Sequence, residues 1–342
     1  MTLTTALALF GVVLLVALAL HGWWSTRRAQ PRQVAEPALN AERVEPAMGG
    51  TSEAPLAQEP VALRAAPRRV ARLDALIDAI VPLALEAPIS GEMAMAHLPP
   101  TRRAGSKPFY IEGLDTESGQ WDAFAPGRHY GELQAGVQLA SRSGALNEIE
   151  YSEFVQKVET FAEAVGASAD VPDMLEVVAR SRELDSLASP LDAQLTVTLR
   201  SNGVAWSVGY VQQAAARLGF VTGPVPGRLV LPAAEEGAPP MLVLSVDPQA
   251  ALSDEPQAAA VRECVLSLDV PQTPESAEPF PAFHGAATTL ASDLDATPID
   301  DQGQAITLHA YAAIGQELQQ LYRQLEALDL AAGSAAARRL FA

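Results

Sequence analysis

Histidine is the first residue type to weigh for chemistry in this sequence, because it binds metals and transfers protons near neutral pH. No two of the five histidines stand at the spacing of a zinc-binding pair. The sequence therefore predicts no metal site. The five are His21, His97, His129, His284 and His309.

The single cysteine, Cys264, is the strongest nucleophile that the composition offers. It lies in the strand-like run 261–270, where a free cysteine usually serves as a small buried hydrophobe. One cysteine cannot form an intrachain disulfide, which fits a reducing compartment. We expect Cys264 to be structural rather than catalytic.

Two short polar segments contain residue types that could be catalytic. Ser141, Ser143 and Gly144 form a loop after a strand-like run, but the sequence contains no GxSxG nucleophile elbow. Asp300 and Asp301 are adjacent, so on a turn their carboxylates would not face one another as an acid pair does. The phosphate-binding patterns GxxxxGK[ST] and GxGxxG are absent as well. We therefore expect no enzymatic activity and no cofactor.

Length and charge limit the number of domains and the classes of partner that the chain can have. A chain of 342 residues is long enough for about two domains. Hydrophobic residues make up 49% of it, so a sizeable core can be buried. The formal net charge of -18 argues against binding to nucleic acid, which requires clustered lysine and arginine.

The N-terminal segment predicts a membrane anchor. Residues 3–20 read LTTALALFGVVLLVALAL without a charge, and Trp23 and Trp24 follow where an interfacial aromatic belt would lie. Arg27 and Arg28 come next, and positive charge is retained on the cytoplasmic side. A cleaved signal peptide is the alternative, but its charge would precede the apolar run. We expect residues 1–28 to form an uncleaved single span with its basic stop and a periplasmic N-terminus.

Residues 29–71 differ in composition from the rest of the chain. Prolines recur there among alanine, glutamate and glutamine, without a helical or alternating pattern. Such a segment buries too little apolar surface to offset its ordering entropy. We expect a disordered linker that lets a tethered domain search a volume near the membrane. Its prolines include Pro31, Pro37, Pro46, Pro55, Pro60 and Pro67.

Residues 190–330 predict an α+β domain with an antiparallel sheet and helices on one face. Alternating or short apolar runs indicate strands, and apolar stripes at helical spacing indicate helices. Pro298 would confine the last strand to a sheet edge, and Thr307 would cap the last helix. Strands are expected at 195–199, 228–231, 241–246, 261–270 and 296–299, and helices at 204–218, 280–294 and 307–328.

Residues 72–189 repeat part of this order, which suggests a degenerate tandem pair of α+β units; two unrelated segments with a similar order remain the alternative. Residues 331–342 are left as a tail. In the first unit, strands are expected at 79–85, 107–112 and 133–140, and helices at 90–97, 147–165 and 174–184.

Two stretches resemble the ZipA family of bacterial division proteins. HGWWSTRRAQPRQ, directly after the predicted span, is similar to the family's junction between anchor and linker. In the C-terminal unit, GAPPMLVLSVDP, CVLSLDVPQ and LDATPIDDQGQAITLHAYAAIGQELQQLYRQLE resemble the family's central strands and closing helix. The resemblance covers the anchor and about the last 140 residues, and it is weak in the middle unit.

This resemblance implies a fold and a function. The family has a split β-α-β fold whose open, apolar sheet face binds the C-terminal tail of FtsZ, the tubulin-like filament protein. By resemblance, the chain would tether FtsZ filaments to the bacterial inner membrane at the division site, with its domains in the cytoplasm. Alternatives are a membrane-anchored adaptor that binds another peptide in envelope growth and, with less support, a hydrolase.

A candidate peptide groove follows from strand alternation and from alignment with the family. If Leu266 and its alternate neighbours point inward, the intervening residues point to the open face. The family usually has a large aromatic residue where this chain has Ser267, so the groove is expected to be shallower. Whether one or both units bind peptide stays open. The candidate groove residues are Thr196, Thr198, Val225, Leu244, Val246, Val265 and Ser267.

Overall fold

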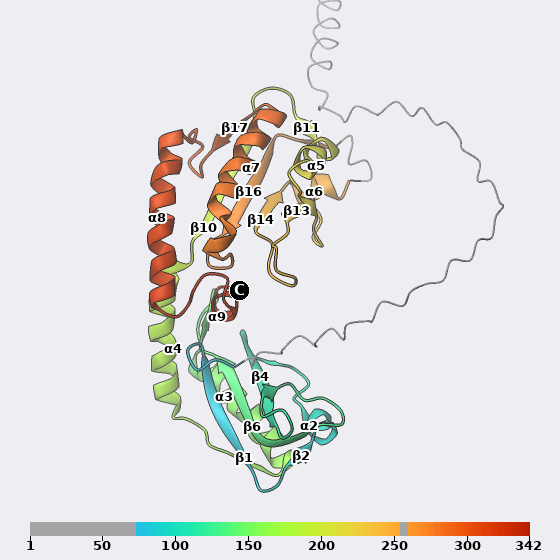
Figure 1. Ribbon diagram of the computed structural model, residues 1–342, viewed down its shortest axis with the longest axis vertical. Helices are drawn as coiled ribbons and strands as arrows, with labels where there is room; N and C mark the ends of the chain where they lie inside the picture. The colour runs from blue at the N-terminus through green and yellow to red at the C-terminus, as the bar shows by residue number, and fades with distance from the viewer. Residues whose placement is uncertain (1–72, 254–258) are drawn as a thin grey trace, which may run out of the picture. The chain divides into compact units, whose positions relative to one another are not determined.

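The computed structural model describes residues 73–253 and 259–342, which form two compact units (Figure 1). The first unit is residues 73–185 and the second is residues 186–342. The predicted anchor and linker, residues 1–71, lie outside the described residues. Within the described part of the chain, no helix has the length and apolar character needed to span a membrane.

The first unit contains a seven-stranded antiparallel sheet, in which the main path runs β3-β4-β6-β1-β9. This sheet consists of β1 (Asp78–Leu85), β2 (Ile89–Ser90), β3 (Arg103–Ala104), β4 (Lys107–Asp115), β5 (Trp121–Asp122), β6 (His129–Gln138) and β9 (Ala167–Ala169), whereas β7 (Ala140–Ser141) and β8 (Gly144–Ala145) pair separately. Its helices are α2 (Gly91–His97) and α3 (Glu148–Val165), and α4 (Met174–Ala188) contains the boundary between the units.

Helix α3 supplies most of the first unit's core. Asn147 begins it with a capping box, in which its side chain accepts from backbone amides and Glu150 reaches back to the cap. Apolar residues then recur every three or four positions, and Phe154 and Val158 are fully buried. The Phe154 ring meets Phe109 of β4 edge to face, with centroids 5.5 Å apart. The expected helix at 147–165 and its buried stripe are confirmed.

The second unit contains a six-stranded antiparallel sheet in the order β12-β13-β14-β16-β10-β17. This sheet consists of β10 (Gln194–Ser201), β12 (Val221–Thr222), β13 (Arg228–Leu231), β14 (Leu242–Ser245), β16 (Glu263–Asp269) and β17 (Ala296–Ile299), whereas β11 (Trp206–Ser207) and β15 (Ala260–Val261) pair separately. Its helices are α5 (Val208–Ala216), α6 (Pro248–Ala251), α7 (Pro279–Leu294), α8 (Leu308–Ala327) and α9 (Ala335–Leu340).

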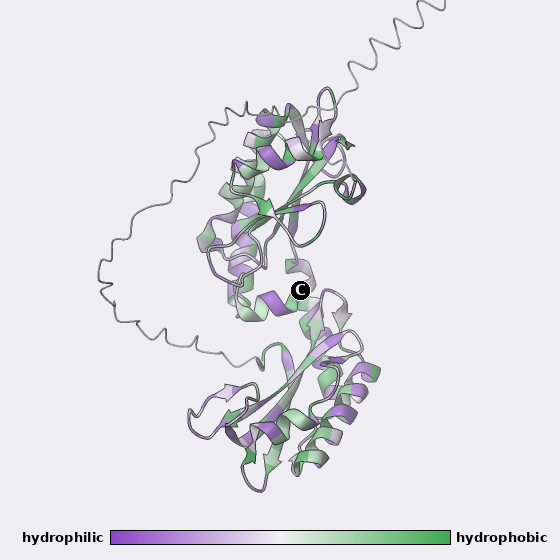
Figure 2. Cartoon of the chain, turned by 90° about the vertical axis from the view of Figure 1, so that its right-hand side faces the viewer, coloured by the Kyte–Doolittle hydropathy of each residue, from purple (hydrophilic) through white to green (hydrophobic). Residues whose placement is uncertain are grey.

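One side of this sheet forms the core of the second unit. Val197, Cys264 and Leu266 share a buried cluster with side chains from α5, α7 and α8. Helix α7 lies across β10 and β16, and α8 lies beside α7 (Figure 1). The helices carry hydrophobic and hydrophilic residues in alternation, as amphipathic helices do (Figure 2). The fold class is therefore α+β with antiparallel sheets.

The central strands of the two sheets follow a similar order. In the first unit the central strands lie in the order β4-β6-β1-β9, and in the second the order is β14-β16-β10-β17. Each long helix, α3 or α7, ends in a left-handed residue, Gly166 or Asp295, and leads into the edge strand. As expected from Pro298, β17 lies at the sheet edge.

Residues 331–342, set apart above as a tail, contain α9 and join the second unit. The Gly333 amide donates to the Pro271 carbonyl at 2.8 Å. The side-chain amide of Gln272 donates to the carbonyl oxygens of Phe341 at 2.7 Å and Arg338 at 3.2 Å. The backbone of this segment therefore completes the hydrogen bonds of a buried glutamine.

Candidate functional site

The face of the second sheet that turns away from the helices is the candidate site. On β10, Val197 and Leu199 are buried, whereas Thr196 is exposed and Thr198 is half-buried. On β16, Val265 and Ser267 are half-buried between the buried Cys264, Leu266 and Leu268. These four outward positions have the orientation expected from alternation.

Leu244 and Val246 do not belong to this face, so their assignment to the candidate groove is wrong. Both are buried, with 0% and 7% of their surface exposed, and both belong to the core cluster. The register explains the error, because Val243 pairs with Ser267 and Ser245 pairs with Val265. Val243 and Ser245 therefore share the outward side with these residues, and their neighbours in β14 point inward.

The outward face is neutral in its middle and charged at its ends. One row across the strands contains Val230, Val243, Ser267 and Thr196. At one end Arg200 and Glu263 form an ion pair at 2.6 Å. At the other end the Gln194 side chain donates to Asp269 at 3.3 Å. A ligand with apolar side chains would meet its best surface at the centre.

A hollow of about 440 Å³ opens on this face beside β13 and β14. Val225, predicted from its place before the strand, lines it and is 48% exposed. Sequence reasoning missed Val230 and Val243, although each alternates with a buried leucine and this could have revealed them. The remaining lining residues are Pro224, Arg228, Pro232, Ala233, Glu235, Glu236, Gly237, Ala238 and Pro240.

Ser267 lies in the middle of the face. Its hydroxyl donates to the Val243 carbonyl at 3.3 Å, so the side chain lies against the neighbouring strand. Ser267 is half-buried and smaller than the aromatic residue expected at this position. An apolar side chain from a ligand can approach the sheet closely at this point.

The equivalent face of the first unit carries a side chain from its own chain. A Cβ built on Gly136 of β6 would lie 2.5 Å from a methyl carbon of Leu73, so the leucine rests on the glycine. Leu73 is 8% exposed. Gly136 turns away from α3, because its neighbours Ala135 and Val137 pair with core residues of β4. The first unit therefore seats an apolar side chain on the middle of its sheet.

The registers match Gly136 with Ser267. The two units can be aligned at the first residue of each edge strand. Ala167 of β9 pairs with Leu85 of β1, and Ala296 of β17 pairs with Ser201 of β10. Five residues earlier in β1 and β10 stand Ile80, which pairs with Gly136, and Thr196, which pairs with Ser267. Leu73 thus covers in the first unit the position that corresponds to Ser267 in the second.

Ser141 and Ser143, weighed above as possible nucleophiles, surround a buried amine. The Lys107 ammonium donates to Ser141 Oγ at 2.9 Å, to Ser143 Oγ at 3.1 Å and to the Gly144 carbonyl. Burial lowers the pKa of Lys107. All three ammonium hydrogens are engaged, so this amine holds the turn between β7 and β8.

The cysteine that was weighed above as a nucleophile is buried in the core of the second unit. Cys264 is 1% exposed, and burial raises the pKa of its thiol to about 12, so it remains an unreactive thiol at neutral pH. Within residues 73–253 and 259–342, no group of histidine, cysteine, aspartate or glutamate side chains could hold a metal ion. No protein-family model matches the sequence, and no curated protein matches it.

Proposed function

We propose that the chain is a membrane-anchored division protein that binds the C-terminal tail of FtsZ. The tail binds the outward face of the second sheet, and the chain tethers FtsZ filaments to the inner membrane at the division site. We also propose that the two units are a degenerate tandem pair of the ZipA-like split β-α-β fold. The observation that carries the proposal is the open, neutral face centred on Ser267, beside the hollow at Val243.

The second unit rather than the first is proposed to bind the tail. In the first unit Leu73 already covers the equivalent position on Gly136. This internal arrangement also suggests how a ligand binds, since it places an aliphatic side chain on the middle strand. A partner peptide would then insert an apolar residue over Ser267 and a second one into the hollow beside Val230 and Val243.

Contact with apolar side chains should dominate the affinity. Val230, Val243 and Val265 are half-buried, and the centre of the face carries no charge. The net charge of -18 would not steer a mixed-charge tail strongly. We expect modest affinity with weak dependence on salt. Attachment of several chains to one filament would then keep the filament at the membrane.

Binding of a fluorescent FtsZ tail peptide to the full chain in detergent tests this proposal. Val265→Glu places a carboxylate in the apolar centre, and we expect it to weaken binding at least about tenfold, or about 1.4 kcal/mol. Thr289→Glu adds the same charge on an exposed position of α7, on the helix side, and should leave binding unchanged.

Absence of tail binding at high micromolar peptide would contradict the proposal. Equal loss from the two glutamate variants would show a general charge effect instead of a groove. If the face bound other apolar peptides but not the FtsZ tail, the adaptor in envelope growth would become the better hypothesis.

A further inference from the structure

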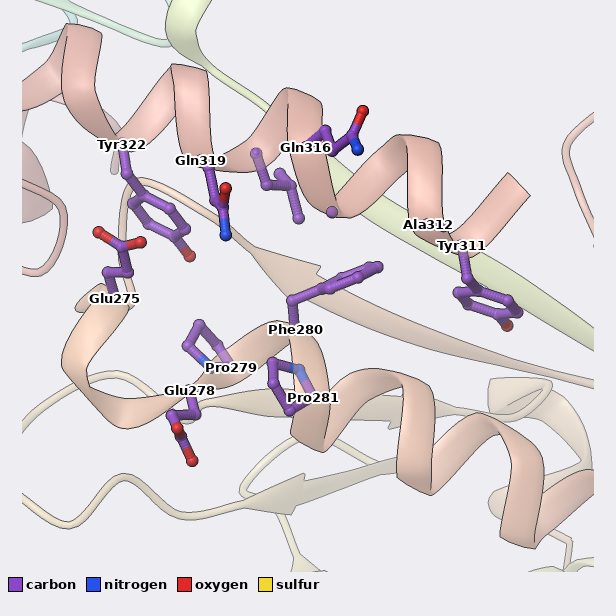
Figure 3. A pocket seen from close by; sticks show the side chains of 12 residues that line it. Glu275, Glu278, Pro279, Phe280, Pro281, Tyr311, Ala312, Gln316, Gln319 and Tyr322 are labelled. Carbon is purple, nitrogen blue, oxygen red and sulfur yellow. The ribbon is translucent and has the colours of Figure 1, made fainter. Parts of the chain in front are cut away.

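A second hollow, of about 470 Å³, lies on the opposite side of the second unit from the open sheet face. It is bounded by the start of α7 and by one side of α8 (Figure 3). Phe280 points from α7 toward α8, and Tyr322 extends from α8 toward the start of α7 (Figure 3). Gly315 makes room for the phenylalanine, because a Cβ there would lie 3.0 Å from its ring.

Two tyrosine hydroxyls at this hollow lack hydrogen-bond partners. Tyr311 and Tyr322 are 9% and 6% exposed, and both line the hollow. Neither hydroxyl has a partner among the residues that the structure describes. A buried polar group that is left unpaired is destabilising. A ligand that enters between α7 and α8 deeply enough to contact the buried Tyr322 oxygen would offer it the missing hydrogen bond.

The charges around the hollow favour a cation. Glu275 and Glu278 stand on its rim, and the twelve described residues that line it include no lysine, arginine or histidine. A helix start normally attracts anions through its free amides. Here Pro279 and Pro281 remove two of the first three N–H groups of α7, and the cap residue makes no side-chain hydrogen bond.

The walls suit one cation in particular. Phe280, Tyr311 and Tyr322 present three aromatic rings, and arginine stacks on aromatic faces more readily than lysine does. A guanidinium can donate at once to a carboxylate and to phenolic oxygens, which accept as well as donate. The volume can hold an arginine side chain together with an apolar neighbour.

We propose that this hollow binds an arginine side chain of a partner protein, presented beside a proline or aliphatic residue. The guanidinium stacks on Phe280, donates to Glu275 on the rim and is held by the hydroxyl of Tyr322. The site is separate from the sheet face, so one chain could hold two different peptides. The proposal does not depend on the identity of the peptide that binds at Ser267.

A matched set of labelled peptides tests the proposal on the full chain in detergent. The probe is Ala-Leu-Arg-Pro-Ala, and the controls replace its arginine with lysine or glutamine. We expect the arginine peptide to bind at least about tenfold more tightly than the glutamine peptide, and its affinity to fall as salt rises. Equal affinity for the arginine and glutamine peptides, or no binding at about 1 mM, overturns the proposal.

Variants of the rim and wall locate the binding. Glu275→Gln should weaken arginine-peptide binding about tenfold, while Glu317→Gln, an exposed residue of α8 outside the lining, should not. Tyr322→Phe keeps the ring and removes one hydroxyl, so it tests the hydrogen bond without emptying the core. Unchanged affinity in both Glu275→Gln and Tyr322→Phe overturns the proposal.

One further measurement tests whether the peptide binds at this hollow or at the sheet face. A second tests whether the bound arginine belongs to a partner or to the chain itself. Val265→Glu on the sheet face should leave arginine-peptide binding intact, so failure of either site is distinguishable from failure of the other. The chain itself carries arginines at Arg64, Arg68, Arg69 and Arg72 that could fill the hollow. If the peptide binds only after these four are changed to glutamine, the occupant is the chain itself and the partner is ruled out.

Discussion

A single carboxylate, that of Glu150, joins a loop to the start of a helix in the first unit. Its Oε1 accepts from the backbone amide of Ser106 at 2.8 Å and from the Ser106 hydroxyl at 2.7 Å. Its Oε2 accepts from the Asn147 side chain at 2.9 Å, at the cap of α3. Four donors, counting the longer one from the Asn147 amide, converge on a group that is 8% exposed.

This geometry predicts how the first unit responds to acid. Burial acts to raise the pKa of Glu150, but the hydrogen bonds from Ser106 and Asn147 outweigh it and lower the pKa. A lowered folded-state pKa means that the carboxylate stabilises the fold above its unfolded pKa of about 4.5, and that this stability is lost as pH falls further.

Glu150→Gln should therefore lower the free energy of unfolding at pH 7 by about 1–3 kcal/mol, and should flatten the loss of stability below pH 4.5. Urea unfolding across a pH series would measure both effects. Glu148→Gln, two residues earlier in the same turn, removes an exposed ion pair with Arg182 and should change stability by less than about 1 kcal/mol. Identical pH profiles for wild type and Glu150→Gln would contradict this account.

At the scale of elements, the middle strand β6 depends on a glycine. Leu73 packs where a side chain at Gly136 would project, with three of its carbons between 2.5 and 3.3 Å from the added Cβ. Gly136→Ala should push the leucine off the sheet and destabilise the first unit by about 1–3 kcal/mol. Thermal unfolding would detect the change.

Two comparisons make this prediction specific. Gly131→Ala in the same strand should be tolerated, because its Cβ would lie at an ordinary 3.5 Å from Thr116. Leu73→Ala should partly rescue Gly136→Ala, since the smaller side chain relieves the clash, and the double-mutant cycle should give a coupling of about 0.5–3 kcal/mol. Additive effects of the two substitutions would show that the leucine does not rest on the glycine.

The sequence analysis located most of the elements, but it assigned Leu244 and Val246 to the wrong face of the sheet. Thr307 caps α8 as its type and position indicated, and the alternation in β16 correctly separated Cys264 and Leu266 from Val265. In β14 the run MLVLSV is apolar at five of six positions, so its pattern identifies the inner face only through Ser245. Alignment with the family led instead to the opposite, incorrect orientation for Leu244 and Val246.

Sequence patterns could predict neither of the two hollows, for a different reason. The one at Val243 depends on the segment 232–240 between β13 and β14, which has neither a helical nor an alternating period. The one between α7 and α8 is lined by Phe280 and Tyr322, which are more than forty positions apart in the sequence. Contacts of that kind follow from the packing of finished elements, and local periodicity carries no information about them.

At the scale of the whole molecule, the boundary of the second unit extends past residue 330. The glutamine Gln272 is 8% exposed and uses its amide hydrogens on carbonyl groups of α9 and Phe341. Leu340 and Phe341 are each 2% exposed. Removing residues 331–342 would leave a buried donor unpaired and would remove Ala332, which packs against the core of this unit.

A chain ending at residue 330 should therefore have a less stable second unit, by about 1–3 kcal/mol or more, since leaving a buried donor unpaired alone costs about that much. Hydrogen exchange read at the amides of β10 and β16 would report on this unit separately, because stability is measured where the protected amides lie. Gln272→Ala in the full chain should produce a smaller loss in the same amides, since it removes the hydrogen bonds and keeps the apolar contacts. If the shortened chain retained full protection in β10 and β16, then α9 would be an appendage, and the domain would end at residue 330 as the sequence alone suggested.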